Sequence, residues 1–217
     1  MPAYRNLDEY LTRAGVLLTN ARQNPAIAAA LDAVGYDDAA LQQGQTLLDT
    51  ARHQSDVQRK EYGDQYGATA ELVQAAAAAE AVYQKHRQLV ATAYKADPAR
   101  LTAFTLNESK KPSFSGWLTQ ARRFYANLLA DAAAVTALGR YKLTRARLEQ
   151  GQALVQQAEQ LNAVQETEKG EAQRATRARD AALDALDDWL ADFKVIAKVA
   201  LADDPQLLEA LQLGAIP

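Results

Sequence analysis

Apolar residues recur at helical spacing along nearly the whole chain. The first such stretch predicts a helix from about Leu7 to Arg22, with an apolar face made of Leu7, Leu11, Ala14, Leu17, Leu18 and Ala21. Asn24 and Pro25 follow, and this pair suits an N-cap with proline in the first helical turn. The pattern therefore predicts an amphipathic helix that breaks at Asn24 and restarts.

The second half of the chain repeats the first at an offset of 107 residues. Aligning Tyr10–Asn107 with Trp117–Gly214 gives 28 identities in 98 positions without a gap. Residues 41–47 (LQQGQTL) match 148–154 (LEQGQAL), and Asp97-Pro98 matches Asp204-Pro205. Two unrelated alanine-rich stretches would not keep one register over this length, so we infer a tandem duplication.

Capping residues mark the same boundaries in both copies. Asn6 and Ser113 suit the N-cap of the first helix, and Asp37 and Thr144 suit that of the second. Each Asp-Pro pair opens a short final helix, expected over Pro98–Thr105 and Pro205–Leu213. Gly35 and Gly139 are expected to end the segments before the second helix. In the second copy Ala132 replaces the proline, so the first helix is expected to continue to Leu138.

The stretch from Asp38 to Ala96 allows two interpretations, because it contains three glycines (Gly44, Gly63 and Gly67) and no proline. A heptad pattern runs through it, with nine of 14 positions apolar in the first copy and 11 of 14 in the second. One unbroken helix would be about 90 Å long. A hairpin turning at Gly63 and Gly170 would use Gly63 as the left-handed residue and Asp64 as the next cap. We favour the hairpin, since glycine destabilises a helix interior by about 1 kcal/mol.

The predicted fold is therefore all-α. We expect a helical bundle built from two copies of a three-helix unit of about 107 residues, with one repeat over residues 1–107 and the other over 108–217. The alternative is two very long helices packed like a coiled coil, together with shorter helices. In either case Ala75, Ala78, Ala79 and Ala93 are expected to form a packed stripe.

Composition excludes several classes of chemistry. Cysteine is absent, which excludes disulfides, thiolate nucleophiles and cysteine-bound metals. With only His53 and His86 present, multi-histidine metal sites are excluded as well. The net charge of -3 argues against a globally basic nucleic-acid binder. The N-terminal residues contain no apolar signal region and no stretch is long and apolar enough for a membrane span, so the expected location is the cytoplasm.

No motif in the chain specifies a reaction. Neither histidine has a glutamate three residues before it, and His86 lies on an apolar stripe, which predicts a half-buried core residue. Asp187-Asp188 and Asp203-Asp204 are paired carboxylates, interpreted as surface and helix-cap residues. Gly44 and Gly151 are interpreted as sites of close helix contact. No phosphate loop or nucleophile motif occurs, so we predict no catalytic, cofactor-binding or metal-binding residue.

One polar set recurs in both copies. It comprises Gln58, Glu61, Gly63 and Thr69 in the first, and Gln165, Glu168, Gly170 and Thr176 in the second. Such residues could line a groove between the copies, but because the set is local and centred on glycine we expect it to cap a turn.

Charge is distributed unevenly. Residues 109–148 carry eight Lys and Arg against Asp131 alone, whereas residues 180–209 carry eight acids and two lysines. In a hairpin these segments would run antiparallel, with Lys142 and Arg145 within reach of Asp192 and Asp203-Asp204. We expect these charges to pair within one hairpin. If Arg145 instead lies far from every acid of this segment, the basic surface becomes available to a nucleic acid or an acidic protein.

These features favour a non-catalytic structural or protein-interaction module that binds a protein partner or a second copy of itself. The first alternative is a nucleic-acid-associated protein that uses the basic segment 110–147. The second is an enzyme or small-ligand binder with a pocket between the repeats.

Overall fold

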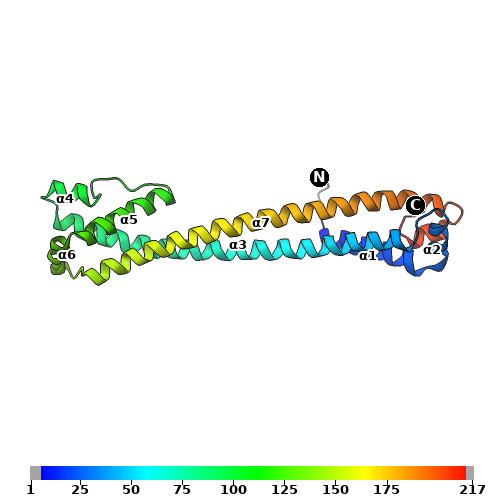
Figure 1. Cartoon of the computed structure of the whole chain (residues 1–217), viewed down its shortest axis with the longest axis horizontal. Helices are drawn as coiled ribbons and strands as arrows, with labels where there is room; N and C mark the ends of the chain where they lie inside the picture. Colours follow the sequence, from blue (N-terminus) through cyan, green and yellow to red (C-terminus); the bar gives the residue numbers. More distant parts are fainter. Residues whose placement is uncertain (1–5, 214–217) are drawn as a thin grey trace. The chain divides into compact units, whose positions relative to one another are not determined.

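The computed structural model describes residues 6–213, and within that range every regular element is a helix (Figure 1). Two helices are much longer than the rest, namely α3 and α7, with 56 residues each. The elements in chain order are α1 (Leu7–Gln23), α2 (Pro25–Asp32), α3 (Asp38–Ala93), α4 (Pro98–Ala103), α5 (Phe114–Ala130), α6 (Ala132–Leu138), a 3₁₀ turn (Gly139–Tyr141), α7 (Arg145–Ala200) and α8 (Pro205–Ala210). The all-α prediction is confirmed. No helix between residues 6 and 213 combines the length and apolar character that crossing a bilayer requires.

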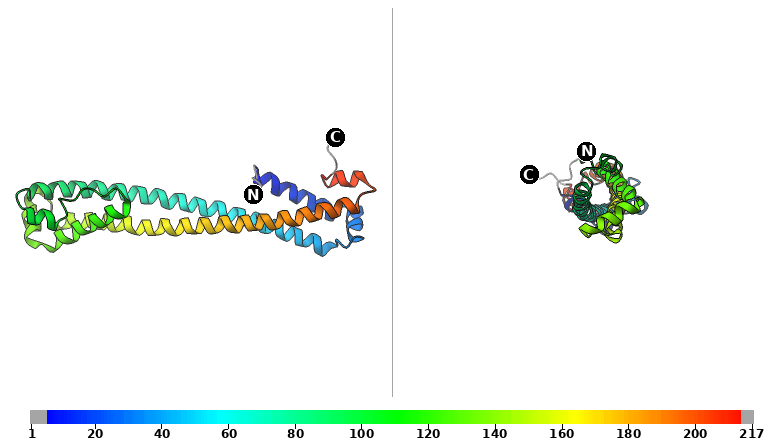
Figure 2. Two further views of the ribbon diagram at one scale, coloured as in Figure 1. Left: turned by 90° about the horizontal axis from the view of Figure 1, so that it is seen from above. Right: turned by 90° about the vertical axis from the view of Figure 1, so that its left-hand side faces the viewer.

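The chain divides into two compact units, and each long helix contributes one part to each unit. Unit 1 contains residues 6–62 and 171–213, and unit 2 contains Gly63–Gly170. Within each unit, the parts of α3 and α7 pack side by side and run in opposite directions (Figures 1 and 2). This division differs from the one expected from the repeats, whose boundary at residue 107 remains a prediction from the sequence.

Unit 1 packs α1, α2 and α8 against its parts of the two long helices. Its fully buried side chains include Leu18, Ile27, Leu31, Leu48 and Phe193. The Trp189 and Phe193 rings stack with centroids 5.2 Å apart and planes at 7°. The apolar face predicted for the first helix is confirmed, because Leu11, Ala14, Leu17, Leu18 and Ala21 are the buried residues of α1.

Unit 2 packs α4, α5 and α6 against its parts of α3 and α7. Figure 1 shows α5 lying along these two helices near the end of the unit where α6 and the start of α7 also lie. The core there is aromatic, and the Tyr83 and Phe124 rings meet edge to face at 5.3 Å. Tyr125 and Leu128 of α5 are also fully buried.

The hairpin expected at Gly63 and Gly170 is wrong, because both residues lie inside continuous helices. Among the described glycines only Gly35 has a positive φ, so neither residue adopts the left-handed conformation that the turn required. A glycine in a helix interior costs about 1 kcal/mol. A turn would instead leave up to four backbone N–H and four C=O groups without helical partners at the two new ends. The alternative of two long helices is therefore correct, and the three-helix unit is not.

One smaller expectation also fails at the start of the second copy. The helix after Phe114 does not continue to Leu138, because Asp131 accepts a hydrogen bond from the Ala134 N–H at 2.8 Å and starts α6. An aspartate N-cap thus breaks the helix without proline. The expected end at Gly139 is confirmed, because Gly139 is the C-cap of α6; its backbone is right-handed, and Lys142 takes the left-handed conformation after the 3₁₀ turn. The predicted caps at Asn6, Asp37, Asp97, Ser113, Thr144 and Asp204 are all confirmed by side-chain acceptance of a backbone N–H.

The elements recur at the offset found in the sequence. Adding 107 to the bounds of α1, α3 and α4 gives those of α5, α7 and α8. Left-handed residues recur in the same way, as Gly35 with Lys142 and Thr105 with Gln212. The repeated bounds are what a duplicated chain would produce, and the duplication itself remains an inference from the sequence.

The alanine stripe of α3 is packed only in part. Ala79 is fully buried against the aromatic core of unit 2. Ala75 and Ala93 are half-buried, and Ala78 is exposed. The prediction was wrong for Ala78 because residues 75–79 are all alanine, so the sequence does not indicate which of them face the core.

Candidate functional site

The recurring polar set does not cap a turn. Thr69 donates to the Gln65 carbonyl at 2.8 Å, and Thr176 donates to the Ala172 carbonyl at 2.9 Å. Both hydroxyls therefore bond to their own helix one turn back, which is common for threonine inside helices. Glu61 lies in unit 1, where Lys60 pairs with it at 3.4 Å, and Glu168 lies in unit 2. This set thus belongs to the long helices and not to a turn.

His86 lies in the core of unit 2, as predicted, and His53 is exposed. The His86 Nδ1 atom is 3.0 Å from the hydroxyl of Tyr125 on α5. Burial lowers the pKa of His86, and the positive charge of Arg147 on α7 lowers it further. Burial also raises the pKa of Tyr125. Both groups are thus held neutral, which suits a structural hydrogen bond between side chains of α3 and α5.

Gly44 and Gly151 are both sites of close contact, and in each case the neighbour is an aromatic side chain. A Cβ atom on Gly44 would lie 2.4 Å from the Trp189 ring, in unit 1. A Cβ atom on Gly151 would lie 2.3 Å from the Tyr125 hydroxyl, in unit 2. The sequence predicted the close approach but not that an aromatic ring occupies the space.

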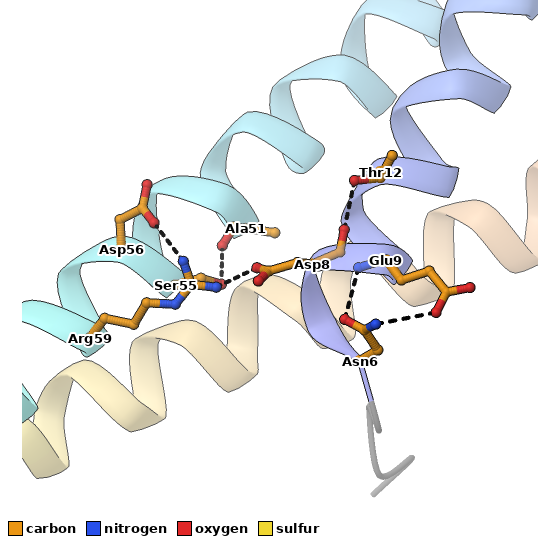
Figure 3. Close-up of polar contacts among 8 residues, drawn as sticks. All are labelled: Asn6, Asp8, Glu9, Thr12, Ala51, Ser55, Asp56 and Arg59. Atoms are coloured by element: carbon orange, nitrogen blue, oxygen red, sulfur yellow. Dashed lines mark hydrogen bonds and ion pairs between the residues drawn. The ribbon is translucent and has the colours of Figure 1, made fainter.

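A polar cluster fixes the start of α1 on α3 in unit 1 (Figure 3). Arg59 of α3 pairs with Asp8 of α1 and with Asp56 of its own helix, the latter at 3.3 Å. Asn6 caps α1 by accepting from the Glu9 N–H at 3.2 Å. Figure 3 shows Arg59 between Asp8 and Asp56, and Asn6 bonded to Glu9, so these groups have partners as structural contacts.

The charge pairing expected for the basic segment does not occur. Arg145 contacts Glu149 at 3.5 Å and the Leu129 carbonyl at 3.1 Å, both in unit 2. Lys110 pairs with Glu80, and Arg122 pairs with Glu159 at 2.6 Å. These partners of the basic segment all belong to unit 2. The hypothesis required a hairpin turn at Gly170, and it fails because α7 is a continuous helix through that residue.

Of the two aspartate pairs, Asp204 and Asp187 form hydrogen bonds that stabilise the fold. Asp204 caps α8 by accepting from the Leu207 N–H at 3.3 Å. Asp187 accepts a hydrogen bond from the Tyr10 hydroxyl, which joins α7 to α1 within unit 1.

A pocket of about 300 Å³ lies in unit 2 at the N-terminus of α5. Ser113 caps this helix by accepting from the Gly116 N–H at 3.2 Å. Lys111, Arg123 and Glu108 are among the residues that line the pocket. Gln120, which is only 3% exposed, also lines the pocket.

Sequence reasoning did not predict this site, because it treated Ser113 only as a helix cap and counted Lys111 and Arg123 only as part of the basic segment. A signal was present in the alignment. At the offset of 107, Lys111 falls on Tyr4 and Arg123 on Val16, so these two basic residues occur only in the second copy.

The loop that forms one wall of the pocket is held in place from two sides. Arg87 of α3 donates to the carbonyls of Leu106 at 3.0 Å and Glu108 at 2.6 Å. Gln120 Nε2 donates to the Ser109 carbonyl at 3.0 Å, whereas its Oε1 has no hydrogen-bond partner among the described residues.

The α5 pocket is lined by both hydrogen-bond donors and acceptors, which is an arrangement suited to binding a polar ligand. Comparison with known proteins gives no match to a family model, to a curated protein or to a solved structure.

Proposed function

We propose that the chain is a non-catalytic structural module that self-associates through the outer face of α3 in unit 2. This proposal rests on an apolar stripe made of Tyr66, Ala70, Val73, Ala77 and Ala81, which we call the outer stripe. All five residues are exposed, with Tyr66 at 71% and Val73 at 61%. An exposed apolar stripe at helical spacing is typical of a surface that binds another helix.

The outer stripe lies opposite the buried side of the same helix. At about 100° per residue, positions 66, 70, 73, 77 and 81 fall within one sector, and Ala68, Ala79 and Tyr83 fall on the other side. Those three residues are at most 8% exposed. This stretch of α3 is therefore apolar on two faces, of which only one is covered within the unit.

The stripe is complementary to itself in an antiparallel pair. In one antiparallel register, each residue lies opposite the residue of the other copy whose number brings the sum to 147. Tyr66 of one copy then faces Ala81 of the other, and Ala70 faces Ala77. The large ring thus meets a small side chain at both ends of the contact, as a twofold interface requires. Small residues in the middle let the two helix axes approach closely, and no charged side chain belongs to the stripe.

Sedimentation velocity of the full chain tests this proposal. We expect a concentration-dependent dimer, and we expect Val73→Glu to make the chain monomeric, because a carboxylate in an apolar interface loses its hydration. Val73 is largely exposed in one chain, so the melting temperature of the monomer should change little. Val195→Glu is the matched control, since Val195 is 64% exposed on α7 in unit 1. A parent chain that stays monomeric, or equal effects of the two variants, would contradict the proposal.

The second candidate function is binding of a polyanion by the basic segment. The observation that favours it is the exposure of Arg140 and Lys142 in unit 2. Within the described part of the chain, Arg140 and Lys142 form no ion pair, and Arg140 stacks over Tyr141 at 4.7 Å. These charges face solvent at the start of α7.

Titration of fluorescently labelled DNA and RNA tests this second candidate. The Arg140→Gln/Lys142→Gln variant should bind more weakly and show a smaller dependence of affinity on salt. The Lys194→Gln/Lys198→Gln variant, which removes the same charge from unit 1, should bind like the parent. No binding at low salt, or equal losses in both variants, would exclude this candidate.

A further inference from the structure

The pocket at the N-terminus of α5 collects cations and acceptors in a small space. Lys111 and Arg123 line it, and neither forms an ion pair with any residue between 6 and 213. The N-terminus of the 17-residue helix α5 adds a partial positive charge. These groups attract an anionic group of a ligand, such as a carboxylate.

Gln120 gives an independent sign of a ligand. Its side chain is 3% exposed and lines the pocket, and its Oε1 atom has no donor among the described residues. The amide cannot be turned without cost, because Nε2 donates to the Ser109 carbonyl at 3.0 Å. A buried carbonyl oxygen without a donor is unfavourable by about 1–3 kcal/mol, so a ligand that donates a hydrogen bond there would relieve that cost.

Glu108 determines which donor fits. Glu108 lines the same pocket, and its carboxylate would repel a ligand that carries only negative charge. A protonated amine satisfies Glu108 and Gln120 Oε1 together, because it has three N–H donors and a positive charge. The ligand should therefore carry an anionic and a cationic group a short distance apart.

The backbone around the pocket is shaped to keep it open. A Cβ atom on Gly116 would lie 2.9 Å from both Lys111 Cβ and Ser113 Oγ. Glycine at this position therefore lets the stem of Lys111 pack over the first turn of α5. Arg87 holds the preceding part of the loop through the carbonyls of Leu106 and Glu108.

We propose that this pocket binds a free α-amino acid. Its carboxylate lies between Lys111 and Arg123 at the N-terminus of α5, and its ammonium group lies between Gln120 Oε1 and Glu108. The size of about 300 Å³ accommodates a small or medium amino acid. This site is independent of the outer stripe and of self-association.

Nuclear magnetic resonance titration of the full chain tests the proposal with three matched probes. L-alanine carries both charged groups, propionate lacks the ammonium group and ethylamine lacks the carboxylate. We expect L-alanine at millimolar concentration to shift the Gly116 amide and the Gln120 side-chain amide. We expect the other two probes to bind at least about tenfold more weakly, which corresponds to 1.4 kcal/mol. Equal binding of propionate and L-alanine, or no shift with L-alanine, would overturn the proposal.

Neighbouring residues provide controls for charge. Arg123→Gln and Lys111→Gln should each weaken L-alanine binding about tenfold or more, because each removes a charge-assisted hydrogen bond. Arg122→Gln and Lys110→Gln remove the same charge one residue away, where the side chains pair with Glu159 and Glu80. These two variants should bind L-alanine like the parent. If Arg122→Gln weakens binding as much as Arg123→Gln, general electrostatics is responsible and the assigned site is wrong.

Discussion

Replacing Gly44 by alanine is expected to lower the free energy of unfolding by about 2 kcal/mol, as overpacking of a core does. A Cβ atom there would lie 2.4 Å from Cη2 of Trp189 and 2.6 Å from Cζ2 and Cζ3. The indole ring stacks on Phe193, whose side chain is fully buried, so it cannot move away without disturbing the core of unit 1. Denaturant unfolding of the variant and the parent measures the effect.

Gly63→Ala is the matched control on the same helix, and its effect should have the opposite sign. Nothing lies within 4 Å of a Cβ at this position, and the backbone there is helical. Alanine should therefore raise the free energy of unfolding by up to about 1 kcal/mol through its higher helix propensity. If Gly63 were a left-handed turn residue, alanine would destabilise the protein instead. A Gly44→Ala variant as stable as the parent would show that the Trp189 ring has room to move.

Sequence reasoning located the helix boundaries well because they depend on local chemistry. Asn6, Asp97 and Ser113 each satisfy a backbone N–H at the start of a helix, and such a bond needs only residues that are near in sequence. Asp131 was the exception, because the missing proline received more weight than the capping carboxylate. Local signals therefore predict where helices begin more reliably than whether a break occurs.

The continuity of α3 and α7 could not be predicted in the same way. Gly63, Gly67 and Gly170 weaken the helix locally, but the alternative requires two new helix ends with satisfied caps. The balance depends on packing along the whole helix. The polar residues near Gly63 resemble a hairpin tip in sequence, although in the structure they lie along a helix.

The α5 pocket lay beyond sequence reasoning for a related reason. Arg87 is 21 residues from Glu108 and 19 from Leu106, yet its guanidinium group positions that loop. Gln120 then ties the loop to α5 through Ser109. These contacts join separate elements, and no spacing within one helix predicts them.

Replacing Gly151 by alanine is also expected to destabilise the protein by about 2 kcal/mol. A Cβ atom on Gly151 would lie 2.3 Å from the Tyr125 hydroxyl oxygen and 2.6 Å from Cζ. Tyr125 is fully buried between Phe124 and Tyr83, with ring centroids 5.0 and 6.2 Å away, so its ring has no free space to enter.

A double-mutant cycle with Tyr125→Leu identifies the cause. Leucine removes the hydroxyl and the tip of the ring, and it also removes the hydrogen bond to His86, so this variant alone is destabilised. In its presence the added Cβ at residue 151 no longer meets the ring, and alanine should cost less than in the parent. We expect a coupling free energy of at least about 1 kcal/mol between the two changes.

Gly15→Ala is a control for the rigidity of the neighbouring group. A Cβ atom on Gly15 would lie 2.7 Å from Nη2 of Arg52, the end of a flexible side chain that is exposed to solvent. This variant should stay within about 0.5 kcal/mol of the parent or be more stable, because Arg52 can adopt another rotamer. Strictly additive effects of Gly151→Ala and Tyr125→Leu would show that Tyr125 does not determine the space above Gly151. The helix would then require glycine there for another reason, and the close contact between α5 and α7 in unit 2 would lose its assigned cause.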